Sequence, residues 1–220
     1  DHRDLHSFPT RRSSDLGFGS WGMWRDAASR GHEIANHSVD HGDLTDRDAQ
    51  YLGETINGMY DLIQDKIGVA PRSFIFPFDK WDAQSLTTVL ERHTAIRATE
   101  YLTHYYAHVF CPILGGRSFR TEHALRYFDF ARRGRFWLIL ECHAMKDGQY
   151  RGFQQLEART LDEMLAFLRE NPEDFWVDTF GAIFEYQRMR KNTVIDFKWL
   201  AEQTLAIYVQ PPTPAEPAGL

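Results

Sequence analysis

Two histidines four positions apart are the residues of this sequence best suited to chemistry. His37 and His41 follow residues 32–35, a short stretch that reads as a strand. On a helical turn, this spacing places both imidazole rings on one face, close enough to share a tetrahedral metal ion. Neighbouring polar side chains could hold the ring N–H groups: Asn36, Ser38 and Asp40. The residue types and their spacing therefore make this segment a candidate metal site.

The spacing alone does not separate a metal site from structural histidines. Ten histidines in 220 residues give about 0.45 chance pairs at this spacing. His104 and His108 are a second such pair, set in an aromatic stretch, and we expect no metal there. The residues around His37 and His41 must therefore decide between a metal site and structural histidines.

The elements that must position these residues alternate between helix and strand. Apolar periodicity and capping residues predict helices at residues 21–30, 45–66, 81–92, 122–133, 160–170 and 179–191, with Thr45 and Thr160 as N-caps. Strands are predicted at residues 32–35, 73–76, 94–98, 136–142 and 175–178, the fourth being apolar enough to be covered on both faces. The alternation favours a parallel α/β sheet or barrel, in which reactive groups gather at the carboxyl ends of strands.

Composition limits the class of protein and its partners. A chain of 220 residues with 43% hydrophobic residues suits one globular domain. The net charge of −6 argues against nucleic acid and anionic membranes as partners, and the longest apolar run, residues 136–140, is too short to span a membrane. Cys111 and Cys142 form no Cys-x-x-Cys motif and are predicted to be buried thiols.

Both ends of the chain differ in character from its middle. Residues 1–16, DHRDLHSFPTRRSSDL, agree in register with the in-frame translation of a common sequencing adapter, so we expect this segment to be foreign and the natural N-terminus to be missing. Four prolines between positions 211 and 217 predict a disordered tail over residues 210–220. The domain is therefore expected to span residues 17–209.

Several segments resemble, in order, motifs of the polysaccharide deacetylases, the family of the chitin, peptidoglycan and acetylxylan deacetylases. GHEIANHSVDH, at residues 31–41, resembles the second motif, H-[ST]-x-x-H. FIFPFD, at residues 74–79, is similar to the third, and LILECH, at residues 138–143, to the last. WVDTFG, at residues 176–181, resembles the closing strand and helix of one subgroup. The resemblance spans about residues 17–191 and implies a distorted (β/α) barrel.

The resemblance also implies roles for individual residues. His37 and His41 would bind a divalent metal, expected to be zinc, that activates water toward an acetyl carbonyl. Pro77 and Phe78 would shape the acetyl pocket, and the Phe78 backbone N–H would hold the oxyanion. Packing alone remains an alternative for these two residues.

The resemblance also implies catalytic roles for two further residues. His143 would protonate the leaving group, although it could instead be a core histidine that ends a buried strand. The third family motif often carries an arginine at the position where this chain has Ile75. Arg97 would take the place of that arginine near the base. For Arg97, a surface arginine at a strand end is the alternative.

The departures from the family are as informative as the matches. The first family motif, Thr-Phe-Asp-Asp, supplies the base and the third metal ligand, and it is missing from these 220 residues. No convincing fourth motif exists, and Asp129 is expected to be solvated. The resemblance therefore predicts an incomplete barrel that lacks its first strands, with little or no turnover, because loss of a base costs about 10²–10⁴-fold.

The expected substrate is an acetylated polysaccharide or oligosaccharide, with the acetyl group on nitrogen or oxygen. Other functions stay open: a hydrolase of small amides on the same scaffold, a sugar-binding domain without catalysis, or a plain α/β domain with structural histidines. The compartment and the oligomeric state are not determined, although family members are commonly exported, which favours an extracytoplasmic location.

Overall fold

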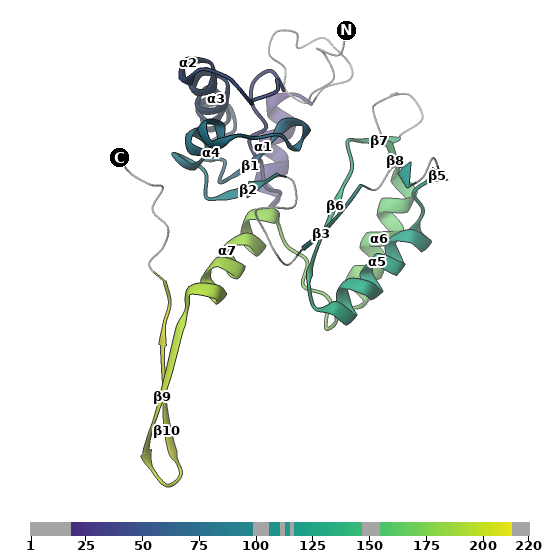
Figure 1. Cartoon of the computed structure of the whole chain (residues 1–220). Helices are drawn as coiled ribbons and strands as arrows, with labels where there is room; N and C mark the ends of the chain where they lie inside the picture. Colours follow the sequence, from purple (N-terminus) through teal and green to yellow (C-terminus); the bar gives the residue numbers. More distant parts are fainter. Residues whose placement is uncertain (1–18, 99–105, 111–112, 115–116, 147–154, 213–220) are drawn as a thin grey trace. The chain divides into compact units, whose positions relative to one another are not determined.

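The computed structural model describes residues 19–98, 106–110, 113–114, 117–146 and 155–212. The chain divides into two compact units (Figure 1). Unit I comprises residues 20–99 and 178–220, and unit II comprises residues 1–19 and 100–177. The adapter-like segment 1–16 lies outside the described residues, as does most of the predicted tail.

Unit I begins with helix α1 (Trp21–Ser29), which agrees with the predicted helix. The Ser20 side chain caps it by accepting a hydrogen bond from the Met23 N–H, and Gly31, with a φ of 90°, follows its end. No helix among the described residues is long and apolar enough to cross a membrane.

The predicted helix at residues 45–66 is wrong at its start and in its continuity. It begins at Ala49 and has three parts: α2 (Ala49–Leu52), the π-helical turn η1 (Gly53–Asn57) and α3 (Gly58–Ile67). Asp48, rather than Thr45, is the N-cap and accepts from the Tyr51 N–H, because the Thr45 hydroxyl donates to Asp43 instead. The apolar spacing predicts a buried face of Leu52, Ile56, Met59, Leu62 and Ile63. Four of these are fully buried, whereas Leu62 is half-buried.

Two short parallel strands lie beside this helix. Strand β1 (Ser73–Ile75) pairs with β2 (Ala95–Arg97), and helix α4 (Ala83–Leu90) connects them. The predicted strand at residues 32–35 is reduced to an isolated parallel bridge between Asn36 and Phe74. The chain at Asn36, β1 and β2 thus run in the same direction, so the residues that follow them emerge at one edge. The core beneath is apolar: Leu44, Leu52, Ile56, Phe74, Phe76, Val89, Ile96 and Ala98.

The carboxylate of Glu33 connects the start of unit I to its last helix, α7 (Phe180–Asn192). Glu33 Oε2 accepts a hydrogen bond from the Gly181 N–H at 2.8 Å, and the Ser73 hydroxyl donates to Oε1. A negative charge at this position is favourable because backbone N–H groups converge at a helix N-terminus. A Cβ on Gly181 would lie 2.7 Å from Glu33 Oε1, so glycine permits the close approach.

Unit I ends in an antiparallel hairpin that the sequence reasoning missed. It consists of β9 (Val194–Ala201) and β10 (Thr204–Gln210), and nearly all of its side chains are exposed. The tail predicted to begin at residue 210 therefore follows a regular element directly. The strand predicted at residues 175–178 is absent, and extended chain leads into α7 instead.

The described residues of unit II form two helices and three strand pairs. Strands β3 (Tyr106–Phe110) and β6 (Trp137–Glu141) are parallel, as are β7 (Ala144–Lys146) and β8 (Gln155–Glu157), whereas β4 (Ile113–Leu114) and β5 (Arg117–Ser118) are antiparallel. Helices α5 (Thr121–Gly134) and α6 (Ala158–Glu170) pack around a second apolar core: Phe119, Ala124, Phe128, Leu156 and Met164.

Three local predictions in unit II differ from the structure. Helix α6 begins before Thr160, which is buried inside the helix, so Thr160 is not its N-cap. Strand β6 is mostly half-buried rather than covered on both faces. Cys142 is exposed, whereas Cys111 lies outside the described residues.

The fold class is α/β, as predicted, with parallel pairs in both units. The described residues form five separate two-stranded sheets and do not close a barrel. The site residues expected in the first half of the chain all belong to unit I, and His143 belongs to unit II.

Candidate active site

His37 stands directly after the backbone bridge to β1. The Asn36 N–H donates to the Ser73 carbonyl, and the Ile75 N–H donates to the Asn36 carbonyl, both at 2.9 Å. The His37 ring then turns onto the end of β1, where its Nδ1 lies 2.7 Å from the Ile75 carbonyl oxygen. A carbonyl only accepts, so Nδ1 carries the proton and Nε2 is the basic nitrogen of the neutral ring.

His41 meets His37 through a loop rather than through the predicted helical turn. Ser38 and His41 have φ angles of 68° and 53°, in the left-handed region that breaks a helix. The Ser38 hydroxyl accepts from the His41 N–H at 3.0 Å, which holds this conformation. The two ring centroids are 4.6 Å apart and the rings are nearly perpendicular. The predicted juxtaposition is thus confirmed, with a different backbone.

Asn36 anchors this loop from within the core. Its Oδ1 accepts from the Ser38 N–H at 2.9 Å, and its Nδ2 lies 2.9 Å from the Ile56 carbonyl oxygen and 3.0 Å from His93 Nε2. His93 Nδ1 in turn lies 2.9 Å from the Val89 carbonyl oxygen. Sequence reasoning missed His93 because no motif or local spacing connects it to Asn36.

Burial keeps His93 neutral. Only 2% of the residue is exposed, and desolvation lowers its pKa from 6.5 to about 4. A neutral ring can donate from Nδ1 to Val89 and accept at Nε2 from Asn36, so both of its hydrogen bonds are satisfied at neutral pH.

Asp40 supports the loop from its other side. Burial alone would raise the pKa of Asp40, but hydrogen bonds from the Tyr51 hydroxyl, the Gly42 N–H and the Thr55 hydroxyl bring it below the ordinary 3.8. The three polar residues expected to hold the imidazole N–H groups thus form hydrogen bonds with backbone groups, with His93 and with side chains of α2 and η1. The structure instead places the backbone carbonyl of Ile75 at the ring N–H of His37.

Phe78 extends the pair of rings. The short 3₁₀ turn η2 (Pro77–Asp79) follows β1, with Pro77 buried and Phe78 in the left-handed region at φ 57° and ψ 14°. The Phe78 ring lies edge-on to the His41 ring at 4.7 Å between centroids, and 61% of Phe78 remains exposed. Pro77 therefore packs, whereas Phe78 offers an accessible apolar face next to the imidazoles.

Arg97 ends β2 and forms an ion pair with the turn that carries Phe78. Its Nη1 is 2.9 Å from Asp79 Oδ1, and the two side chains are 10% and 20% exposed. The alternative of a surface arginine is therefore wrong. The Phe76 N–H also donates to the Arg97 carbonyl at 3.0 Å, so Arg97 holds the turn through both backbone and side chain.

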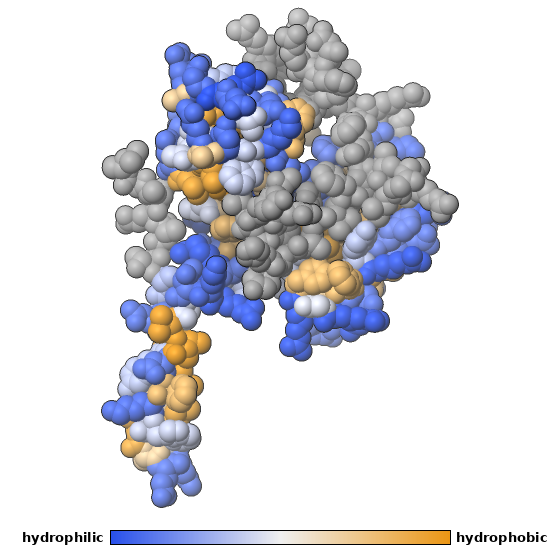
Figure 2. Space-filling model, in the orientation of Figure 1, coloured by the Kyte–Doolittle hydropathy of each residue, from blue (hydrophilic) through white to orange (hydrophobic). Residues whose placement is uncertain are grey.

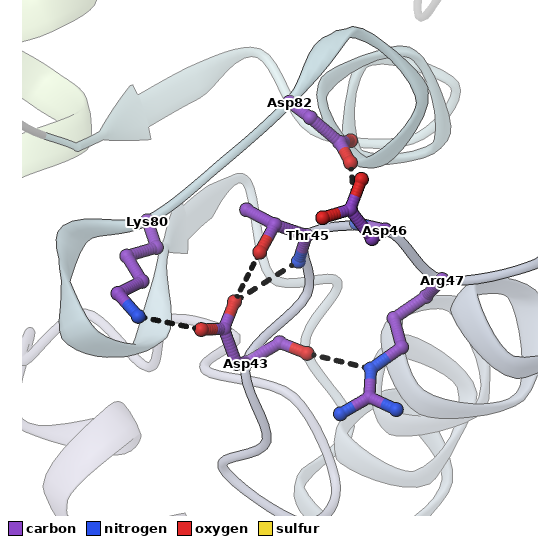
Figure 3. A network of polar contacts seen from close by, with 6 residues as sticks. All are labelled: Asp43, Thr45, Asp46, Arg47, Lys80 and Asp82. Carbon is purple, nitrogen blue, oxygen red and sulfur yellow. Dashed lines mark hydrogen bonds and ion pairs between the residues drawn. The ribbon is translucent and has the colours of Figure 1, made fainter.

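A polar network joins the loop after His41 to the loop after Phe78 (Figure 3). Asp43 Oδ2 receives the Lys80 ammonium at 2.7 Å, and Asp43 Oδ1 accepts from both the N–H and the hydroxyl of Thr45. The hydrogen bond from Lys80 and those from Thr45 lower the pKa of Asp43 to about 2. Asp82 Oδ2 accepts from the Asp46 N–H at 2.8 Å. These contacts fix the spacing between the two loops.

His143 follows β6 in unit II. Its Nε2 lies 3.6 Å from Glu141 Oε1, and 29% of its side chain is exposed. It is therefore not the fully buried core histidine of the alternative reading. Its expected role as an acid toward the His37 site stays a prediction.

The donors of unit I fit two positions of a metal site. A basic Nε2 on His37, oriented by a carbonyl at Nδ1, is the arrangement that metal-binding histidines commonly have, and the His41 ring faces it. In the part of the chain that the structure describes, no group of three or more His, Cys, Asp or Glu residues could hold a metal ion. The third ligand expected from the family thus has no counterpart among these residues.

Comparisons with known proteins address the family and the fold. The polysaccharide deacetylase family model matches residues 8–95, whereas no curated protein sequence matches the chain. The chain is similar to the crystal structure of the Xyl-CE4 domain of a multidomain xylanase from the hindgut metagenome of Trinervitermes trinervoides, with 16% identity and a TM-score of 0.51, over 77% of this chain and 71% of that one.

Two further structures show similarity. A family 4 acetyl xylan esterase from Clostridium thermocellum, solved with a cobalt ion, has 16% identity and a TM-score of 0.51, over 76% of this chain and 71% of that one. BA3943, a CE4 family pseudoenzyme from Bacillus anthracis, has 11% identity and a TM-score of 0.48, over 74% and 50%. Residues 8–95 therefore match the polysaccharide deacetylase family model, and the chain has an α/β fold similar to that of the Xyl-CE4 domain and the acetyl xylan esterase.

Proposed function

We propose that this chain derives from a metal-dependent hydrolase that removes acetyl groups from a carbohydrate. The observation that carries the proposal is the oriented pair of imidazoles, with His37 Nδ1 on the Ile75 carbonyl and the His41 ring 4.6 Å away. Structural histidines need no such shared orientation at the carboxyl edge of parallel strands, whereas ligands to one metal do. The family match over the same residues supports this interpretation.

His37 and His41 would hold a divalent cation, with zinc the expected ion because imidazole nitrogen suits it. When bound, such an ion polarises an acetyl carbonyl and lowers the pKa of water. The exposed Phe78 ring would cover the methyl side of the acetyl group, and its backbone N–H would stabilise the developing oxyanion. Arg97 would keep the Phe78 turn in place through Asp79.

We propose that the 220 residues by themselves hydrolyse acetyl groups slowly or not at all. The sequence contains no Asp-Asp pair, and the described residues provide two metal ligands rather than three. Without a positioned base, the rate falls by about 10²–10⁴-fold. His143 remains the proposed acid for the leaving group, which would be the amine or hydroxyl of an acetylated polysaccharide or oligosaccharide.

A zinc titration by calorimetry tests the metal site directly. We expect one weak site in the chain and none in the double variant His37→Ala/His41→Ala. The matched control is His104→Ala/His108→Ala, which removes the second pair of identical spacing and should leave binding unchanged. His108 lies in strand β3, whereas His104 lies outside the described residues.

Two results would contradict the proposal. One is a folded wild-type chain that takes up no zinc, cobalt or nickel. The other is zinc binding that survives the first double variant and disappears in the second. Acetate release from an acetylated xylan or chitin oligosaccharide at the rate of an intact esterase would refute only the expectation of low turnover.

A further inference from the structure

The β9–β10 hairpin has two chemically different faces. Cross-strand partners on one face are large and apolar: Ile195 with Val209, Phe197 with Ile207 and Trp199 with Leu205. These six residues, here called the hairpin face, are 42–66% exposed. The opposite face is mixed: it carries Asp196 and Lys198 together with the exposed Val194 and Tyr208. Figure 2 shows the hydrophobic side chains gathered along this hairpin.

An isolated hairpin of this kind is unstable as a free element. Two-stranded hairpins are marginal in water unless they pack against another surface, and six large side chains in one apolar stripe would remain in contact with solvent. The pairing is nevertheless regular over nearly the full length of both strands, with one irregularity next to the turn. The regular pairing and the exposed apolar face together indicate that another surface covers it.

We infer that the hairpin face is a homodimer interface, in which the same face of a second copy of this chain covers it. The face carries no charge, so two identical faces can meet without repulsion, while Asp196 and Lys198 stay in solvent. Identical patches pair about a two-fold axis, which closes the assembly at two copies.

The distribution of side-chain sizes suits an antiparallel arrangement of the two hairpins. The two-fold axis passes near the central pair, Phe197 and Ile207. The largest pair, Trp199 and Leu205, lies at the turn end. It then packs over the smallest pair, Ile195 and Val209, at the base of the second copy's hairpin. Large groups opposite small ones allow two sheets to interdigitate at the usual spacing of about 10 Å.

The area also fits a dimer. Each of the six side chains exposes on the order of 100 Å², so the face offers about 600 Å² per copy. Two copies would bury about 1,200 Å², at the lower limit of stable specific interfaces. The dimer is therefore expected to dissociate on dilution.

Light scattering after size-exclusion chromatography, over a range of protein concentrations, tests the inference. We expect a dimer at high concentration that dissociates on dilution. Ile207→Asp should shift the protein to monomer at every concentration, because it places a charge at the centre of the face. Ala206→Asp is the matched control: it introduces the same residue one position along the same strand, on the opposite face and across from Lys198, and should leave the dimer intact.

Hydrogen exchange gives a second measurement that does not depend on any variant. Amides of residues 194–210 should become more protected as the protein concentration rises, while those of α3 should not change. A wild-type chain that is monomeric at all concentrations would overturn the inference. So would a dimer that persists in Ile207→Asp, or one lost equally in both variants.

Discussion

His93 makes the stability of unit I depend on pH. Its pKa is about 4 in the folded state against 6.5 for an exposed histidine, because the ring is buried. The unfolded chain therefore binds the proton more tightly, and stability rises with pH across this interval. The contribution of neutral His93 to the stability of unit I is fully present above pH 6.5 and is lost as the pH falls toward 4. The shift of 2.5 units corresponds to about 3 kcal/mol.

Protonation also breaks a specific contact. In the neutral ring, His93 Nε2 accepts a hydrogen bond from Asn36 Nδ2. In the charged ring, Nε2 carries a proton and can no longer accept this hydrogen bond. Asn36 holds the Ser38 N–H and thereby the loop of His37 and His41. We expect the loss of stability to begin at this loop and at the neighbouring β1.

Hydrogen exchange of the β1 and α3 amides, followed by mass spectrometry at pH 7 and pH 5, measures this effect in unit I. The wild-type opening free energy should fall by about 2 kcal/mol between these pH values, corresponding to the 1.5 units below pH 6.5. Asp43, with its pKa lowered to about 2, loses its contribution only when the pH falls below about 4, so it does not interfere. In His93→Gln, which cannot become charged, most of this pH dependence should disappear.

The control is His123→Gln, which changes a histidine of unit II and should keep the wild-type dependence. Equal pH dependence in wild type and His93→Gln would refute the reasoning. A wild-type opening free energy that does not change between pH 7 and pH 5 would refute it as well.

Other substitutions test the packing of unit I, each measured by urea denaturation. Gly181→Ala places a Cβ 2.7 Å from the Glu33 carboxylate and should lower the free energy of unfolding by about 1–3 kcal/mol. Gly58→Ala, in a helical backbone with open space around it, should raise it by about 0.5–1 kcal/mol. The opposite order would show that α7 does not depend on the contact with Glu33. Ile56→Ala removes a fully buried side chain and should cost about 2–5 kcal/mol, so a loss below 1 kcal/mol would contradict the core as described. Lys80→Ala breaks an exposed ion pair with Asp43 and should cost no more than about 1 kcal/mol, decreasing with added salt.

Local patterns predicted the elements whose stability comes from their own residues. Helices α1 and α5 lie within two residues of their predicted bounds, and the buried face of α3 follows from its apolar spacing. The spacing of His37 and His41 also indicated that their rings meet. In these cases periodicity and capping act over one or two helical turns, so the sequence contains the necessary information.

Only the tertiary structure decided the contacts between distant parts of the chain. Asn36 meets His93 across 57 positions, and Glu33 caps α7 across 148. The sequence reasoning also missed the hairpin and set the start of the long helix at Thr45 instead of Ala49. A threonine or a histidine has several possible partners, and burial in the folded chain selects among them because an unpaired polar group inside the core is costly.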